Sequence, residues 1–192
     1  MDTATESTPT TDTVRAWIGC LGCYNNGDLV GQWLTAAECD DLVGVGLQVR
    51  ARDEDGELGD LCPRCGAEEF WVMDHEGLPA AVLSGECSPC QFHELATSWE
   101  TVDSPEMVAA WLYDCGETVT AENLADLAER AGECFTHCDT MEEYAEELVR
   151  DSGDLAKVPE FLHQYINYAS YAHDMKCNGV LTEHEGFVFR SE

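Results

Sequence analysis

The chain has 192 residues, of which 39 are acidic and 9 are basic, and its formal net charge is -30 at pH 7. Because such a charge repels phosphates, the composition excludes a protein that binds nucleic acid directly. Hydrophobic residues make up 44% of the chain, which is enough to build a core and excludes a disordered acidic protein. The acids are spread over all three thirds of the sequence, which predicts a surface suited to a partner that holds a polyanion.

The start of the chain and its apolar runs indicate where the protein resides. Residues 1–13 are Thr-rich and acidic, without the basic start of a signal peptide, and we expect a disordered tail there. The longest apolar runs, such as Leu78–Leu83, are far too short to span a membrane. We therefore expect a cytoplasmic protein without membrane contact, whose cysteines are reduced.

Residues 14–84 predict an N-terminal antiparallel β domain. Two strand-like runs, Arg15–Cys23 and Leu29–Leu34, flank the turn Tyr24–Gly27, whose Asn-Gly pair favours a hairpin. A third strand is expected at Glu69–Asp74.

Residues 85–132 predict a helical middle domain. Ser88 and Ser104 each stand directly before a proline, the arrangement of an N-cap followed by the first helical residue, and Thr120 begins a third helix. The apolar residues that follow are spaced by three and four, so each helix has one apolar face.

Residues 133–192 predict a C-terminal α+β domain. Thr140 and Glu143 form a capping box for a helix that ends at Arg150, and a second helix is expected to begin near Pro159. Short strands are expected at residues 133–138 and 186–189. The predicted fold class is thus α+β, an elongated chain of three small domains.

The helix that begins after Thr140 carries a row of acids. Each i,i+4 pair of glutamates costs about 0.2–0.5 kcal/mol of helix stability, so the row suggests a purpose other than folding. An ordinary solvated face is the alternative. The expected partner-binding residues are Glu142, Glu143, Glu146, Glu147 and Asp151. The stripe expected to be buried beneath them is Met141, Tyr144, Ala145, Leu148 and Val149.

Cysteine spacing predicts one structural zinc ion per chain, and simple burial of the thiols without metal is the alternative. The sequence Cys62-Pro-Arg-Cys65-Gly resembles a zinc knuckle, whose backbone amides point at both thiolates. A second pair must complete the tetrahedral site, and the spacing leaves two candidates. These are Cys87 with Cys90, or alternatively Cys20 with Cys23. The remaining cysteines are expected to be small core residues, namely Cys39, Cys115, Cys134, Cys138 and Cys177.

No catalytic motif stands out, and we expect no enzyme. Cys134, His137 and Cys138 are close in sequence, but no oxyanion loop or third orienting residue accompanies them. Phosphate-binding loops and nucleophile elbows do not occur in the sequence.

Five landmarks occur in an order that resembles the ArdA antirestriction proteins. They are Tyr24–Gly27 followed by Gly31 and Trp33, then Trp71–Gly77, Met141–Leu148, Tyr165–Tyr168 and Phe187–Phe189. The likeness runs from about Arg15 to Phe189. His75 departs from the tyrosine of many relatives, and the Cys62–Cys65 knuckle is not a general family feature, so zinc is inferred from spacing alone.

The resemblance implies a non-catalytic inhibitor of type I restriction-modification enzymes. The family's fold would be three small domains, paired into a homodimer through the third, and its acids would imitate the phosphates of bent B-form DNA. The segment Thr136–Ser152 corresponds to the family's antirestriction segment and contains the acidic row.

The residues alone leave two other functions open. One is an acidic zinc-binding interaction protein for another basic partner. The other is a salt-adapted acidic domain, which the presence of only two lysines, Lys157 and Lys176, would fit. The five tryptophans argue against the weakened core expected of such a domain.

Overall fold

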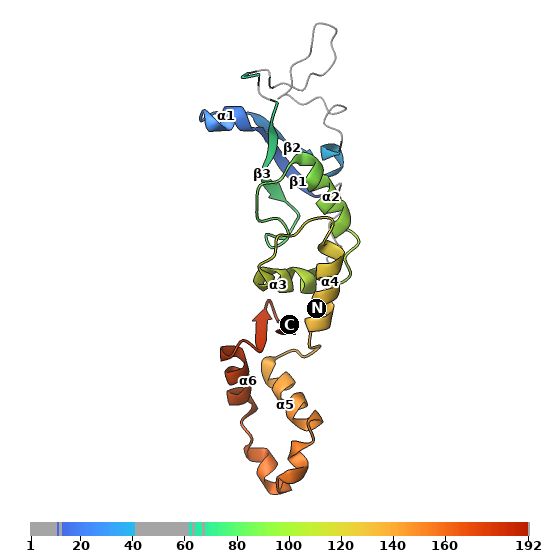
Figure 1. Cartoon of the computed structure of the whole chain (residues 1–192), viewed down its shortest axis with the longest axis vertical. Coiled ribbons are helices and arrows are strands. Elements are labelled where there is room, and N and C mark those ends of the chain that lie inside the picture. The colour runs from blue at the N-terminus through green and yellow to red at the C-terminus, as the bar shows by residue number, and fades with distance from the viewer. Residues whose placement is uncertain (1–10, 12, 41–61, 63, 67, 192) are drawn as a thin grey trace, which may run out of the picture. The chain divides into compact units, whose positions relative to one another are not determined.

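The computed structural model describes residues 11, 13–40, 62, 64–66 and 68–191 (Figure 1). Most of the expected tail, residues 1–13, lies outside the described residues. The chain forms two compact units. Unit 1 holds the described residues up to Pro105 together with Thr118–Ala125, and unit 2 holds the rest. Antiparallel sheets and helices occur together, which confirms the α+β class, while the three-domain division stays a prediction.

Unit 1 is built on a three-stranded antiparallel sheet. Its strands are β1 (Arg15–Cys20), β2 (Gly31–Thr35) and β3 (Phe70–Glu76), in the order β2-β1-β3. The three predicted strands are thus confirmed. One boundary was wrong, because β1 ends at Cys20 instead of Cys23 and the helix α1 (Leu21–Asn25) follows directly.

A glycine allows β1 and β2 to pair closely. Gly31 lies opposite Gly19 in the register, and a Cβ at Gly31 would stand 2.5 Å from the Ile18 carbonyl oxygen. No side chain fits at that distance. The adjacent pair Trp17 and Trp33 meets edge to face, with ring centroids 6.1 Å apart.

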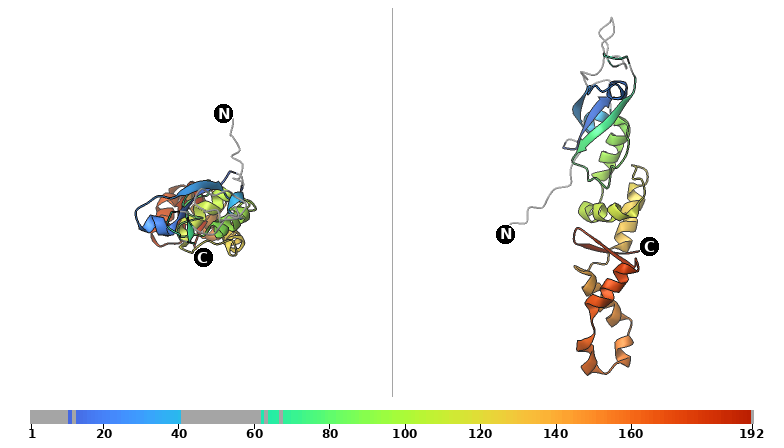
Figure 2. Two further views of the ribbon diagram at one scale, coloured as in Figure 1. Left: turned by 90° about the horizontal axis from the view of Figure 1, so that it is seen from above. Right: turned by 90° about the vertical axis from the view of Figure 1, so that its left-hand side faces the viewer.

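Helix α2 (Pro89–Trp99) packs beside β3 and the short 3-10 helix η1 (Ala37–Cys39) (Figure 2). Its predicted start is confirmed, because the Ser88 hydroxyl accepts the Gln91 N–H while the Gln91 side chain accepts the Ser88 N–H. The apolar face of α2 is buried throughout. It consists of Phe92, Leu95, Ala96 and Trp99.

Two more helices lie mostly in unit 2. They are α3 (Pro105–Cys115), the predicted helix after Ser104, and α4 (Leu124–Cys134). Only Pro105 of α3 and the residues of α4 before Asp126 belong to unit 1. Arg130 links them: its guanidinium lies 5.3 Å from the centre of the Trp111 ring and 2.7 Å from a Glu117 carboxylate oxygen.

The rest of unit 2 is a helix pair with a hairpin. Helices α5 (Met141–Asp151) and α6 (Tyr168–Cys177) lie side by side, and β4 (Leu181–His184) pairs with β5 (Phe187–Arg190) (Figure 1). The closing strand is confirmed, while its partner β4 was not predicted. The core between these elements consists of Met141, Ala145, Ala172, Met175, Leu181 and Val188, with Tyr144 packed against it.

Two predictions in this region were wrong. The helix expected to begin near Pro159 starts later: the 3-10 helix η3 (Glu160–Tyr165) follows Pro159, and the α-helix α6 covers only the second half of the expected range. A further 3-10 helix, η2 (Asp154–Lys157), precedes Pro159. Asn167 caps α6, since its side-chain oxygen accepts the Ser170 N–H at 2.9 Å. Residues 133–138 form no strand, and only Phe135 makes an isolated bridge, to Phe189.

Candidate functional sites: an acidic helix face and a four-cysteine cluster

The acidic row predicted on α5 lies at the protein surface. Glu142, Glu143, Glu146, Glu147 and Asp151 are all exposed. Beneath them the predicted stripe is only partly confirmed: Met141 and Ala145 are buried and Tyr144 and Val149 half-buried, but Leu148 is exposed. The α6 packing covers one side of α5 and leaves Leu148 outside it.

The start of α5 is fixed by its cap. The Thr140 hydroxyl accepts the Glu143 N–H at 3.1 Å, as predicted. The second bond of the predicted capping box differs, because the Glu143 carboxylate accepts the N–H of Asp139, at 2.9 Å, instead of that of Thr140. Glu142 and Glu143 stand in the first turn, where the helix dipole favours negative charge. Two members of the row are therefore favourably placed for helix stability despite their mutual repulsion.

Two further glutamates of the row have polar partners. Glu146 forms an ion pair with Arg150 at 2.7 Å, on the same face. Glu147 accepts a hydrogen bond from the Cys138 thiol, whose sulfur lies 3.4 Å away. Burial, then this hydrogen bond and the charge of Glu147, raise the pKa of the Cys138 thiol. Among the described residues, Glu142 and Asp151 make no side-chain hydrogen bond or ion pair, so their charge faces solvent.

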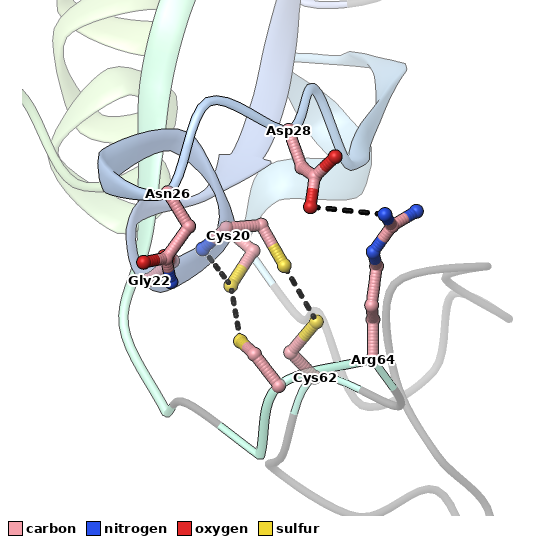
Figure 3. Close-up of polar contacts among 8 residues, drawn as sticks. Cys20, Gly22, Asn26, Asp28, Cys62 and Arg64 are labelled. Atoms are coloured by element: carbon pink, nitrogen blue, oxygen red, sulfur yellow. Dashed lines mark hydrogen bonds and ion pairs between the residues drawn. The ribbon is translucent and has the colours of Figure 1, made fainter.

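The second site is a group of four cysteines in unit 1 (Figure 3). The sulfurs of Cys20 and Cys65 lie 3.5 Å apart, and those of Cys23 and Cys62 lie 3.7 Å apart. All four ligand atoms lie within 4.8 Å of one another, close enough to hold a metal ion. Cys20, Cys23 and Cys62 are buried, and Cys65 is exposed.

Local backbone structure positions each pair. Cys20 ends β1 and is the N-cap of α1, where the Cys23 N–H donates to the Cys20 sulfur at 3.5 Å. On the other side, Gly66 adopts a φ of 72° and its N–H donates to the Cys62 carbonyl at 2.8 Å, which closes the knuckle.

The thiols of the cluster ionise unequally. Burial acts to raise the pKa of Cys62, but hydrogen bonds from the Arg64 and Cys65 backbone and from the Cys20 and Cys23 thiols lower it to about 7. Burial raises the pKa of both Cys20 and Cys23. Cys62 is thus more readily deprotonated than Cys20 or Cys23.

Of the two second pairs considered for the knuckle, the structure brings in Cys20 and Cys23. Cys87 and Cys90, the other pair considered, lie outside the group. The reason is the start of α2: the Cys87 thiol donates to the Ser88 carbonyl at 3.1 Å, and the Cys90 thiol points to Glu94, 3.7 Å away. The signal that favours Cys20 and Cys23 is antiparallel pairing of β1 with β3. Cys20, at the end of β1, lies opposite Phe70, the first residue of β3, and the Cys62–Cys65 knuckle precedes β3 in the chain.

The remaining cysteines behave largely as small buried residues. Cys39, Cys134 and Cys138 are buried, but Cys115 is half-buried and Cys177 is exposed, so the expectation was wrong for Cys177. The His137 ring packs against Phe135, with centroids 4.6 Å apart, and the Cys138 thiol bonds to Glu147. These contacts give Cys138 a carboxylate neighbour, which disfavours a thiolate nucleophile.

No helix in the described part of the chain is long and apolar enough to cross a membrane.

The chain matches a known family over almost its whole length. A comparison with curated proteins found no match. The sequence profile of the family described as Antirestriction protein (ArdA) matches residues 16–189. The chain therefore belongs to the ArdA family of antirestriction proteins.

Proposed function

We propose that this protein inhibits type I restriction-modification enzymes by occupying their DNA-binding groove as a mimic of bent B-form DNA, without catalysis. The observation that carries the proposal is the exposed acidic row on α5, anchored by a capped N-terminus and a buried underside. Family membership supports the antirestriction role. The sign and the spread of the charge support the DNA-like surface.

The magnitude of the charge is similar to that of a DNA segment that would fill the DNA-binding groove of the enzyme. B-form DNA carries two phosphates per base pair, so 39 carboxylates correspond to roughly 20 base pairs, an upper bound because 9 cations offset some of them. Residues four apart on a helix are separated by a rise of about 6 Å. Glu142 and Glu146 thus present their carboxylates in a row along one face of α5.

Such a mimic needs no base edges. Phosphate contacts position a DNA-binding protein, whereas base contacts supply its sequence specificity. We therefore propose that the inhibitor acts on enzymes of different recognition sequences, and that its binding weakens as salt increases.

The direct test is competition with DNA for the methyltransferase core of a type I enzyme at low salt. The wild-type chain should displace labelled target DNA, and the variant with Gln at positions 142, 143, 146 and 147 should need at least about tenfold more protein, as expected from a loss of about 1.4 kcal/mol. The matched control replaces four exposed glutamates of unit 1 with Gln, namely Glu68, Glu69, Glu76 and Glu86.

Each outcome discriminates. Loss of competition in the α5 variant but not in the control supports the acidic row as the binding face. Equal loss in both would indicate that only net charge matters. A wild-type chain that does not displace DNA would contradict the proposed function. If that chain instead bound a basic protein such as a histone, a different basic partner would be favoured.

We also propose a homodimer formed through unit 2. Apolar side chains are exposed around η3, including Phe161 at 68% and Tyr165 at 74%. Residues 158–171 contain a single acid, Glu160, in a chain of charge -30. Two copies can approach with the least repulsion where acids are sparse, so this surface favours a second copy.

Light scattering tests the dimer. The double variant Phe161→Ser with Tyr165→Ser should reduce the measured mass from that of a dimer toward that of a monomer. Tyr24→Ser, which removes an exposed aromatic ring from unit 1, is the control and should leave the mass unchanged. A monomeric wild-type chain would contradict the proposal.

A further inference from the structure

We infer that the cluster of Cys20, Cys23, Cys62 and Cys65 is a structural zinc site, a role separate from the proposed inhibition of restriction enzymes. In tetrahedral thiolate sites the Zn–S distance is about 2.3 Å, so neighbouring sulfurs stand roughly 3.8 Å apart. The sulfur pairs at 3.5 and 3.7 Å, all within 4.8 Å, approach that arrangement. The four sulfurs therefore surround a space suited to one ion.

Other uses of four cysteines fit the distances less well. A disulfide requires sulfurs about 2.05 Å apart, which is much shorter than either pair. A cluster of several irons separates its four cysteines more widely than a single ion does. Among single ions, both zinc and iron occupy tetrahedral sites of four cysteines. Zinc is the usual ion where such a site has a structural role.

The surroundings also suit thiolates. The Cys23 N–H points at the Cys20 sulfur, and the Gly66 N–H donates to the Cys62 carbonyl, so both Cys-x-x-Cys segments form tight turns. The Arg64 guanidinium, 2.9 Å from an Asp28 carboxylate oxygen, ties the second knuckle to the segment after α1 (Figure 3).

A metal here would fasten two parts of unit 1 that are distant in sequence. Cys23 and Cys62 are 39 positions apart, and the Leu21 N–H donates to the Glu69 carbonyl at 3.0 Å beside the cluster. The ion would thus hold the end of β1 against the start of β3, where the strand pairing ends at Phe70.

The first test is elemental analysis of the full chain, purified without chelator or a metal-binding tag. The wild-type chain should contain about one zinc per chain. The double variant Cys62→Ser with Cys65→Ser should contain none, whereas the control Cys87→Ser with Cys90→Ser should retain the ion. A wild-type chain with no metal, or with iron, overturns the assignment, as does zinc retained by the first variant.

A second test needs no variant that might fail to fold. Cys65, Cys90 and Cys177 are all exposed, so an alkylating reagent can reach each of these thiols unless a metal holds it. In the zinc-loaded wild-type chain, peptide mapping should show Cys65 protected at least about tenfold relative to Cys90 and Cys177, and a strong chelator should abolish the protection. If Cys65 is alkylated as fast before chelation as after it, the proposed site is overturned.

Cobalt(II) supplies a spectroscopic check. Added to the metal-free chain, it should give the visible bands of a tetrahedral thiolate site and saturate at about one ion per chain. Absence of these bands in a folded chain would overturn the proposal. Competition for DNA sites on the restriction enzyme is measured separately, so either proposal can fail while the other stands.

Discussion

The sulfur of Cys23 lies 3.7 Å from the sulfur of Cys62, although the two residues are 39 positions apart in the chain. The contact joins the turn that follows β1 to the knuckle that precedes β3. Two Cys-x-x-Cys turns that are distant in sequence thus face each other at one end of the sheet.

We expect removal of the proposed zinc ion from this cluster to destabilise unit 1 selectively. A cross-link across a loop of about this length stabilises a fold by about 3–4 kcal/mol through loop-closure entropy. Hydrogen exchange should therefore accelerate at the β1 and β3 amides after chelation and stay unchanged in α5 and α6. Equal exchange in unit 1 before and after chelation would contradict a structural role.

Gly31→Ala should destabilise the sheet by about 1–3 kcal/mol, because the new Cβ would stand 2.5 Å from the Ile18 carbonyl oxygen and must separate β1 from β2. Urea unfolding, followed through tryptophan fluorescence, would measure the loss. Gly85→Ala is the matched control, since no atom lies within 4 Å of its Cβ position. A Gly31→Ala chain as stable as the control would contradict the close pairing.

The sequence predicted one pair of the four-cysteine cluster, Cys62 with Cys65, and left its partner open. A Cys-x-x-Cys spacing fits both a knuckle and the first turn of a capped helix, and Cys87 with Cys90 belongs to the latter. Only the antiparallel register, which sets Cys20 opposite Phe70, distinguishes the two pairs. Such a register depends on contacts between distant residues, which spacing along the chain does not contain.

The acidic face was predictable because it rests on local signals. Thr140, the charge row and the apolar period all act within one helix, and the cap is confirmed at Glu143. The region after α5 was harder, since an apolar spacing of three residues, as from Leu162 to Tyr165, suits both 3-10 and α-helices. The cap at Asn167, well beyond Pro159, decides where the α-helix starts.

Thr140→Ala should lower the free energy of unfolding by about 1 kcal/mol, because it removes the hydroxyl that accepts the Glu143 N–H. It should also weaken competition with DNA, since the first turn of α5 carries Glu142 and Glu143. Thr140→Ser preserves the acceptor and should restore both properties. Unfolding in urea and the competition assay measure the two effects, and equal behaviour of Ala and Ser at this position would contradict the cap.

Glu147→Gln should lower the pKa of Cys138, because it removes one of the causes that raise it, the carboxylate charge beside the thiol. A pKa raised in the folded state contributes stability below the thiol's ordinary pKa of 9.0, and that contribution is lost as the pH rises through the folded value. The variant should thus lose less stability above about pH 9. Alkylation rates of Cys138 against pH would report the shift, and an unchanged profile would contradict the role of Glu147.

Arg150→Gln should strengthen inhibition while leaving stability almost unchanged. The Glu146–Arg150 pair is about half exposed on both sides, and solvent screening limits such pairs to about 0–1 kcal/mol. Without Arg150, however, the carboxylate of Glu146 would present its full charge beside Glu142 and Glu143. Competition with DNA, measured over a series of salt concentrations, should show tighter binding and a steeper salt dependence than the wild-type chain. Lys157→Gln is the control, because Lys157 pairs with Asp154 beyond the acidic row, at 2.6 Å. Weaker inhibition by Arg150→Gln would indicate that the arginine itself contacts the enzyme, and would contradict a purely anionic binding face on α5.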